Sequence, residues 1–373
     1  MARLDHICKL NMGQSPDSSS YNEERFGLPF FQGNADFGQV HPTARVWCSK
    51  PTKEAKPGDI LISVRAPIGA LNIADVACCI GRGLAALTVN EKVCSKGYLW
   101  HALRGKVKEL NQKGTGSTFK AISKNTLAET EIRLPSLDEQ MHIAVVLDKV
   151  DDLISLRKQQ LARLDELIKA RFVEMFGDTI LNPFGWEKDR LGVVCDVRDG
   201  THDSPKYYEI GYPLVTSKNV TGGKIELAEC SFICEEDFNK INERSKVDIG
   251  DIIMPMIGTV GKPVIVDIEP NFAIKNVALI KFKSDSRVLN IYIRALLQSD
   301  YFDDAVLSKV RGGTQKFISL GDIRKLEVLV PPMELQKQFS TFVEQTDKSK
   351  SAVQQSLDKL ETLKKALMQK YFG

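Results

Sequence analysis

One stretch of this sequence occurs twice. The run KPGDILISVRAPIGALNIAD at 56–75 is matched by IGDIIMPMIGTVGKPVIVD at 249–267, and Gly58 and Gly250 lie 192 positions apart in the alignment. A chain of 373 residues is too long for a single ordinary core. The repeat therefore predicts two similar globular domains in one chain.

The later part of each repeat keeps its length, and the earlier part does not. From Gly116 to Gly177 the second copy aligns without a gap at an offset of 196, as Gln140 and Gln336 illustrate. Upstream the offset drifts, and it is 187 at Arg3. This asymmetry indicates a spacer of fixed length attached to a recognition domain whose length varies.

The constant part has the pattern of a long helix. One track of apolar residues recurs every seven positions: Leu147, Ile154, Leu161, Ile168 and Met175. The second copy repeats the track more loosely, with Lys350, Lys364 and Thr346 on its seam. A helix over 139–176 would be about 57 Å long at 1.5 Å per residue. We expect two such helices, paired antiparallel as a coiled coil; the alternative is a helix pair inside an ordinary core.

The variable parts mix short β-rich runs with turns and helices. DILISV, LAALTV, DIIMPMI, PVIVDI and VALIKF read as strands, and 95–105 and 290–306 read as helices. The predicted fold class is α+β, with two pseudo-symmetric globular domains joined by two long antiparallel helices. The expected division is a first globular domain, a central spacer helix, a second globular domain and a C-terminal spacer helix, at 1–135, 136–178, 179–331 and 332–373.

Composition narrows the class of protein. The chain is 43% hydrophobic and 27% charged, as in ordinary globular proteins, and no run of about 18 apolar residues indicates a membrane span. The N-terminus lacks the apolar run of a signal peptide, so we expect a cytoplasmic protein. The eight cysteines show no spacing typical of a zinc site and read as buried thiols.

Positive charge gathers beside glycine-rich loops, although the whole chain has a net charge of only +3. The segment 104–124 has six basic residues against Glu109, and 309–325 has five against Asp322. Cations beside Gly, Ser, Thr and Gln suit a loop that grips a phosphate and then a base edge. For either loop alone, a solvated basic surface is the plain alternative; two copies at equivalent positions favour DNA binding.

Polar loops supply the predicted DNA-binding residues. In the first half these are Gln14, Ser15, Tyr21, Gln32, Asn34, Arg65, Arg82, Lys113, Thr115, Ser117, Thr118 and Lys120. In the second half they are Thr201, His202, Lys206, Ser217, Lys218, Asn219, Lys275, Asn276, Arg311, Thr314, Gln315 and Lys316. His202 is also a conceivable general base, but the sequence offers it no partnered nucleophile.

Motifs for catalysis are missing from the sequence. GTVGK at 258–262 lacks the spacing of a P-loop, and GRG at 81–83 is not a dinucleotide fingerprint. There is no adenine-methyltransferase Asn-Pro-Pro-Tyr motif, no His-Glu-x-x-His and no Gly-x-Ser-x-Gly. We therefore expect a binding protein with no catalytic, cofactor or metal site.

An ordered and doubled set of motifs resembles the specificity (S) subunit of type I restriction-modification systems. The first half contributes GQSPDSSSYNEERFGLPFFQGNADFG (13–38), GDILISVRAPIGALNIAD (58–75), IGRGLAAL (80–87), GTGSTFKAISK (114–124) and LPSLDEQ (134–140). The second half contributes DGTHDSPKYYEIGYPLV (199–215), GDIIMPMIGTVGKPVIV (250–266), NVALIKF (276–282) and VPPMELQ (330–336).

The resemblance implies a division of labour. Two target-recognition domains would each read one half of a bipartite sequence in double-stranded DNA, with the helices acting as spacer and docking platform. Two modification subunits would bind S-adenosylmethionine and methylate adenine, and a restriction/motor subunit would use ATP and Mg. This chain would carry neither reaction. The alternatives are an interaction scaffold that does not bind DNA and a fragment of a fused restriction-methylation enzyme.

Overall fold

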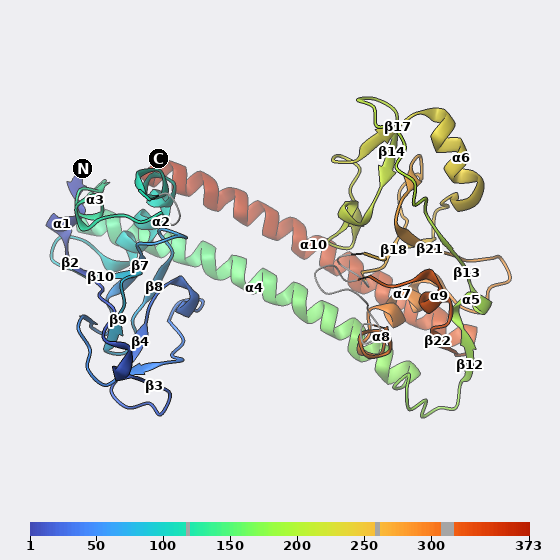
Figure 1. Ribbon diagram of the computed structural model, residues 1–373, viewed down its shortest axis with the longest axis horizontal. Coiled ribbons are helices and arrows are strands. Elements are labelled where there is room, and N and C mark those ends of the chain that lie inside the picture. The colour runs from blue at the N-terminus through green and yellow to red at the C-terminus, as the bar shows by residue number, and fades with distance from the viewer. Residues whose placement is uncertain (117–119, 258–261, 307–316) are drawn as a thin grey trace. The chain divides into compact units, whose positions relative to one another are not determined.

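The computed structural model describes residues 1–116, 120–257, 262–306 and 317–373, which form two compact units (Figure 1). Unit 1 comprises Met1–Lys158 and Gln355–Gly373, and unit 2 comprises Gln159–Gln354. Two helices of 40 residues, α4 (Leu137–Phe176) and α10 (Met333–Phe372), contribute to both units.

Unit 1 contains a four-stranded antiparallel sheet that is buried on both faces. Its strand order is β2 (Cys8–Met12), β10 (Leu84–Val89), β7 (Ile60–Ser63) and β8 (Leu71–Ile73). Successive side chains of a strand point to opposite faces, so the apolar run of β7 serves two cores. Ile60 and Ile62 join the cluster that faces the helices, whereas Leu61 joins the cluster that faces the second sheet.

The second sheet of unit 1 has five short strands. In order they are β3 (Tyr21–Asn22), β5 (Trp47–Cys48), β4 (Leu28–Phe31), β9 (Cys78–Ile80) and β6 (Glu54–Ala55). β4 and β9 run parallel and pair Phe30 with Cys79. Their carboxyl ends therefore open at the same edge of the sheet.

The remaining elements of unit 1 surround the helix-facing core. They are β1 (Ala2–Arg3), α1 (Leu4–Ile7), α2 (Lys96–Lys113), α3 (Lys124–Ala128) and β11 (Glu131–Ile132). α2 continues eight residues beyond the predicted end at 105. No Pro interrupts it, and Glu109 pairs with Lys106 and Lys113 at helical spacing. Part of the basic run at 104–124 is thus helix rather than loop, which corrects the sequence-based expectation.

Unit 2 repeats this topology. Its four-stranded sheet has the order β13 (Asp196–Asp199), β21 (Val277–Lys281), β18 (Ile252–Pro255) and β19 (Val264–Ile265). Its second sheet has the order β17 (Ser231–Ile233), β14 (Tyr212–Val215) and β20 (Ala273–Ile274). β14 and β20 run parallel, as β4 and β9 do in unit 1. The sequence repeat is therefore also a repeat of structure.

Other elements of unit 2 either match unit 1 or are additions. The matching ones are β12 (Glu187–Arg190), α5 (Leu191–Val194), α7 (Asn290–Leu297), α8 (Asp300–Val306), α9 (Leu320–Arg324) and β22 (Glu327–Val330). The additions are β15 (Val220–Thr221), β16 (Lys224–Ile225) and α6 (Glu235–Ser245). The prediction of a single helix over 290–306 is wrong. The chain forms two helices, α7 and α8, and between them the Ser299 hydroxyl donates to the Leu296 carbonyl oxygen at 2.6 Å.

The two long helices pack antiparallel within each unit. In unit 1, Leu147 of α4 shares a core with Leu367 and Phe372 of α10; in unit 2, Phe172 of α4 shares one with Phe339 of α10.

The polar residues on the α10 seam have partners. Lys350 pairs with Asp165 at 2.5 Å, and Lys364 pairs with Asp151. The Thr346 hydroxyl donates to the Phe342 carbonyl oxygen at 2.9 Å. Two of the polar residues that interrupt the heptad pattern of the second copy thus form ion pairs across the seam.

Candidate nucleic-acid interface

Each unit carries a loop that leaves the first strand of its four-stranded sheet and crosses the open edge of the parallel pair. After β2, the backbone N–H of Gln14 donates to the Ile80 carbonyl oxygen at 3.0 Å. After β13, the backbone N–H of Thr201 donates to the Ile274 carbonyl oxygen, also at 3.0 Å. The repeat thus places Gln14 and Thr201 at equivalent positions.

A glycine precedes each of these residues for a steric reason. A Cβ atom on Gly13 would lie 2.1 Å from the Gly81 carbonyl oxygen, and one on Gly200 would lie 2.3 Å from the Ile274 carbonyl oxygen. These are backbone atoms that have little room to move. The close approach therefore requires glycine at both positions.

The next residues of each loop contact the segment that links the parallel pair to the central strand. In unit 1, Arg82 donates from its backbone N and from Nε to Ser15 Oγ at 3.3 and 3.2 Å. In unit 2, His202 Nδ1 lies 2.9 Å from Asn276 Oδ1. Ser15 is equivalent to His202. Arg82 and Asn276 lie in corresponding linking segments, which comprise three residues (81–83) in unit 1 and two residues (275–276) in unit 2.

The unit 1 face consists of five predicted residues around this contact: Gln14, Ser15, Gln32, Asn34 and Arg82. Gln14, Gln32 and Arg82 are exposed, and Ser15 and Asn34 are half-buried. The 3-10 turn Asn34–Asp36 is held by Asp36, which accepts from the backbone N–H of Gln32 at 2.7 Å. Amide and guanidinium side chains on a fixed backbone suit contacts to base edges.

Tyr21, also predicted to bind DNA, contacts the residues that support this face. Its ring stacks on Phe30 with centroids 4.8 Å apart, and its hydroxyl donates to the Pro16 carbonyl oxygen at 3.0 Å. Burial raises the pKa of this phenol. Tyr21 thus fixes the position of the loop that carries Gln14 and Ser15.

The unit 2 face is centred on His202, an exposed imidazole with an acceptor on each ring nitrogen. Nδ1 faces Asn276 Oδ1, and Nε2 lies 2.8 Å from Asp199 Oδ2. The hydrogen bond to Asn276, followed by that to Asp199, raises the pKa of His202. The protonated ring satisfies both acceptors, so the arrangement favours a cation on this face.

The other predicted residues of unit 2 lie on the His202 loop or on the segment after β14, and they differ in accessibility. Thr201 and Ser217 are half-buried, and Lys206 and Lys218 are exposed. Lys206 Nζ lies 5.5 Å from the centroid of the Tyr208 ring. Asn219 is buried, and its Oδ1 accepts from Thr216 N and Oγ1 at 3.0 and 2.9 Å.

Lys275 belongs to the same group, and it is nearly buried. It lies next to Asn276, which has a left-handed backbone with φ of 56°, a conformation that Asn tolerates better than most residues. We take the unit 2 face as Thr201, His202, Lys206, Ser217, Lys218, Lys275 and Asn276.

A second group of predicted residues lies in unit 1 where the basic segment returns to the sheet. Lys120 and Arg65 are exposed around the bridges that Ala121 makes with Arg65 and with Thr115. Lys113 Nζ forms an ion pair with Glu109 Oε1 at 2.7 Å. Six predicted residues lie outside the described residues: Ser117, Thr118, Arg311, Thr314, Gln315 and Lys316.

The flanks of these segments match between the units. The backbone N–H of Ile122 donates to the Val64 carbonyl oxygen at 2.9 Å, and that of Ile318 donates to the Met256 carbonyl oxygen at 2.9 Å. The described residues that follow the two basic loops thus rejoin their sheets at equivalent points.

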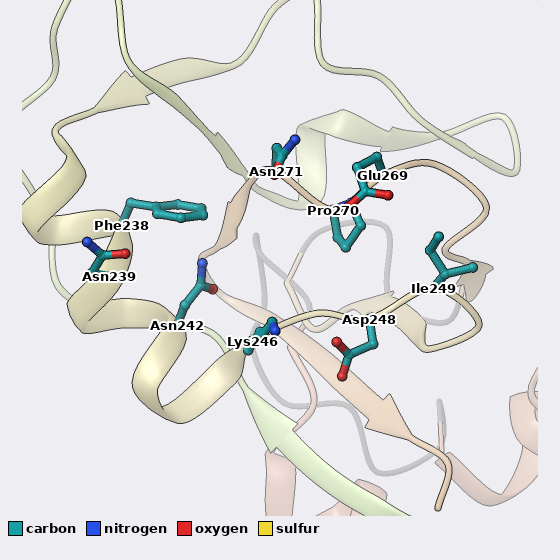
Figure 2. A pocket seen from close by; sticks show the side chains of 9 residues that line it. All are labelled: Phe238, Asn239, Asn242, Lys246, Asp248, Ile249, Glu269, Pro270 and Asn271. Carbon is teal, nitrogen blue, oxygen red and sulfur yellow. The ribbon is translucent and has the colours of Figure 1, made fainter. Parts of the chain in front are cut away.

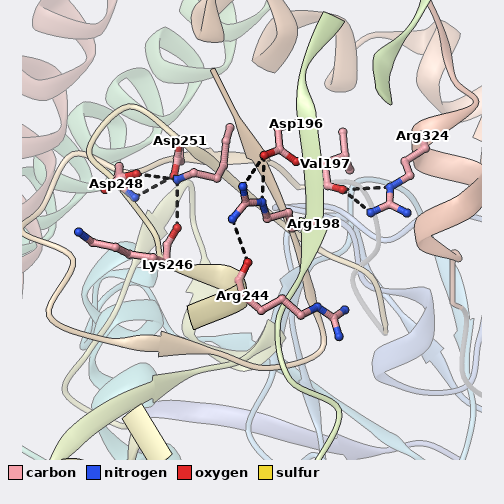
Figure 3. A network of polar contacts seen from close by, with 9 residues as sticks. Asp196, Val197, Arg198, Arg244, Lys246, Asp248, Asp251 and Arg324 are labelled. Atoms are coloured by element: carbon pink, nitrogen blue, oxygen red, sulfur yellow. Dashed lines mark hydrogen bonds and ion pairs between the residues drawn. The ribbon is translucent and has the colours of Figure 1, made fainter. Parts of the chain in front are cut away.

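The sequence did not suggest a polar network around β13, which precedes the His202 loop; Figure 3 shows its contacts between Arg198, Asp196 and Arg244. Arg198 binds Asp196 Oδ2 at 2.9 and 2.6 Å and donates to the Arg244 carbonyl oxygen at 3.0 Å. The Arg244 side chain pairs with Asp199. Burial opposes ionisation of Asp199, but the hydrogen bonds of His202 and Arg244 outweigh it and lower its pKa.

Arg324 of α9 completes this support. It donates twice to the Val197 carbonyl oxygen, at 3.0 and 2.7 Å. Arg244 lies on α6, which has no counterpart in the first half of the chain, so the repeat gave no signal for it.

A shallow hollow of about 550 Å³ lies in unit 2 beside α6 (Figure 2). Its lining comprises Phe238, Asn239, Asn242, Lys246, Asp248, Ile249, Glu269, Pro270 and Asn271. These residues include no nucleophile placed beside a base. Within the described ranges, no group of three His, Cys, Asp or Glu side chains could hold a metal ion. No helix in those ranges is both long and apolar enough to cross a bilayer.

Comparison with known proteins places the chain in a family. The family model for the type I restriction modification DNA specificity domain matches residues 1–166 and 183–362. The type I restriction enzyme MjaIX specificity subunit of Methanocaldococcus jannaschii is 30% identical over 319 residues, 77% of this chain and 70% of that protein. The EcoBI specificity subunit of Escherichia coli is 21% identical over 99% of this chain and 84% of that protein.

Other relatives match only in part. The MjaX protein of the same archaeon is 42% identical over 161 residues, so this chain spans 38% of its length.

A solved structure shares the whole fold. The S subunit of a type I restriction-modification system from M. genitalium aligns over 100% of this chain and 95% of that one, with a TM-score of 0.60 and 16% identity. The doubled α+β topology and the family match over both halves agree, and the chain belongs to the family of the type I restriction modification DNA specificity domain.

Proposed function

We propose that this chain is the sequence-recognition subunit of a type I restriction-modification complex. Each unit reads one half of a bipartite target in double-stranded DNA, through the unit 1 face and the unit 2 face. α4 and α10 set the spacing between the two half-sites and dock the other subunits. The chain itself catalyses neither methylation nor cleavage.

The observation that carries the proposal is the equivalence of two contacts. Ser15 with Arg82, and His202 with Asn276, join corresponding segments of the repeated fold but offer different hydrogen-bonding groups. A common scaffold with different donors and acceptors is what two readers of different base sequences require. A scaffold for one symmetric partner would instead present like residues at these places.

Partner subunits supply the chemistry in this proposal. Two modification subunits bind S-adenosylmethionine and methylate adenine, and a restriction/motor subunit uses ATP and Mg. The curated relatives are named as specificity subunits of restriction enzymes, which supports this division.

The experiment is a map of methylated adenine by single-molecule sequencing. The full chain and a modification subunit are expressed in a host that lacks other adenine methylation. R82A is expected to relax the sequence requirement in one half-site and leave the other half-site unchanged, and N276A is expected to do the reverse. A wild-type target without two separated parts, or both variants altering the same half, would contradict the proposal.

A further inference from the structure

Lys275 is a nearly buried cation with an incomplete set of partners. The residue is 8% exposed, and Nζ donates to the Ser204 hydroxyl at 2.7 Å. No carboxylate lies within 4.0 Å of this ammonium group in the part of the chain that the structure describes. Lys281, the last residue of β21, instead contacts both Asp248 at 2.7 Å and Asp251 at 2.5 Å.

This arrangement costs stability in the free protein. An ammonium group has three donors, and buried charges are normally paired or fully hydrogen-bonded. One neutral hydroxyl uses one donor and leaves the positive charge uncompensated. An anion that binds beside Nζ would supply both the missing acceptors and the missing charge.

The position of Lys275 directs that anion to the unit 2 face. The backbone N–H of Lys275 donates to the Val215 carbonyl oxygen at 2.9 Å, and its backbone pairs with Thr201 in a parallel bridge. Ser204 is exposed and lies two residues after His202, with Asp203 between them. The ammonium group therefore sits under the loop that carries His202, whose raised pKa favours a second cation nearby.

We propose that Lys275 and Ser204 form a phosphate-binding subsite of unit 2. Resting on the proposed DNA-reading function, the subsite takes one backbone phosphate of the half-site bound by this unit. Lys275 neutralises the phosphate, and the Ser204 hydroxyl donates to it. The equivalent residue in unit 1 is Gly81, whose backbone N–H donates to Phe31 O as that of Lys275 does to Val215 O, so unit 1 has no ammonium group at this place.

The test replaces single phosphates of the target duplex with neutral methylphosphonates. Affinity is measured for the full chain bound to a modification subunit, for wild type, K275M and the control K188M, which removes an exposed cation on β12. Wild type and K188M are expected to lose about tenfold in affinity at one phosphate of the unit 2 half-site, and K275M to lose nothing there. K275M is also expected to reduce the slope of log K against log salt by about one.

The outcomes separate the subsite from the function. If wild type binds the bipartite duplex but K275M shows the same methylphosphonate penalties and the same salt slope, the subsite is wrong and the function stands. If wild type shows no preference for its duplex, the function itself is wrong. K275R keeps the cation and controls for a folding defect in K275M. It is expected to lose affinity at the same methylphosphonate position as wild type. Loss at a different position would overturn the subsite.

Discussion

Gln140 and Gln336 make the same three hydrogen bonds in their respective units. Gln140 Oε1 accepts from Ser95 N at 2.9 Å, and Nε2 donates to the Val93 and Pro135 carbonyl oxygens at 3.2 and 2.9 Å. Gln336 repeats this with Leu289 N at 2.8 Å and with the carbonyl oxygens of residues 287 and 331 at 3.0 and 2.8 Å. Each fully buried amide ties the start of a long helix to the globular part of its unit.

Replacing either glutamine should therefore destabilise its unit. Q140L and Q336L each leave buried backbone groups without partners, and we expect each to lower the free energy of unfolding by about 2–4 kcal/mol. Q338L, an exposed position on the same helix as Gln336, should change it by less than about 0.5 kcal/mol. Calorimetric or urea unfolding measures these values. Equal stabilities of Q336L and Q338L would show that the amide does not hold the helix.

The ion pairs of Asp151 should stabilise unit 1 in a pH-dependent way. Burial raises the pKa of Asp151, but Lys364 and Arg104 outweigh it, so its pKa lies below the ordinary value. A depressed pKa gives stability that is present above the unfolded value of about 4 and is lost as pH falls through the folded value.

D151N should therefore lower the free energy of unfolding at pH 7 by about 1–2 kcal/mol, because two cations lose their partner. It should also remove part of the loss of stability below about pH 4. The neighbouring exposed variant D152N serves as control, and urea denaturation between pH 3 and pH 7 is the measurement. A D151N curve parallel to that of D152N would contradict the assignment.

Adding a single carbon to either loop glycine should destabilise the protein. G13A and G200A each place a Cβ against a backbone carbonyl oxygen, so we expect a loss of about 1–3 kcal/mol and disturbed recognition of one half-site. G33A is the matched control for stability, because nothing lies within 4 Å of a Cβ there. Thermal unfolding and DNA affinity test this together. Normal behaviour of G13A would show that the loop does not need the close approach.

His202 should make DNA binding by unit 2 depend on pH. Because hydrogen bonds to Asn276 and Asp199 raise its pKa, against burial and the charge of Arg244, the ring stays charged to a higher pH than a free histidine. The positive charge of His202 is therefore fully present below the ordinary histidine pKa of about 6.5, and it is lost as pH rises through the raised pKa of the folded protein.

We therefore expect affinity for the target to fall from pH 6 to pH 8, with His202 contributing about two- to fivefold. H202Q should remove this part of the dependence, and H142Q, an exposed histidine on α4, should retain it. Fluorescence anisotropy at constant ionic strength measures the affinities. An identical pH profile for H202Q would exclude the charged imidazole from the interface.

Periodicity predicted the elements that pack against one another. The heptad track identified α4, and strands such as β7, β10 and β18 followed from apolar runs, because burial on both faces leaves few other sequences possible. The repeat then transferred each assignment to the other half. Gln140 and Gln336 were recognised only as a matching pair, since hydrogen bonds from a side chain to distant backbone leave no periodic signal.

Contacts between loops were beyond the sequence. Asn219 reads as a surface amide in the polar run 216–223, but it caps a 3-10 turn and is buried. Lys275 follows a buried strand and gives no hint that its ammonium group meets Ser204, 71 residues away. Arg244 lies on a helix without a copy in the first half, so nothing could predict its pairing with Asp199.

The central claim is that two readers act at a separation fixed by α4 and α10. It is tested most directly by inserting seven residues, one full heptad, into both helices, after Lys158 and after Gln354, where the two units divide. A heptad keeps the seam in register and adds about 10 Å of helix, close to three base pairs of DNA. In maps of adenine methylation we expect both half-sites to keep their sequences and the gap between them to lengthen by about three base pairs. An unchanged gap, or an altered half-site, would contradict the account.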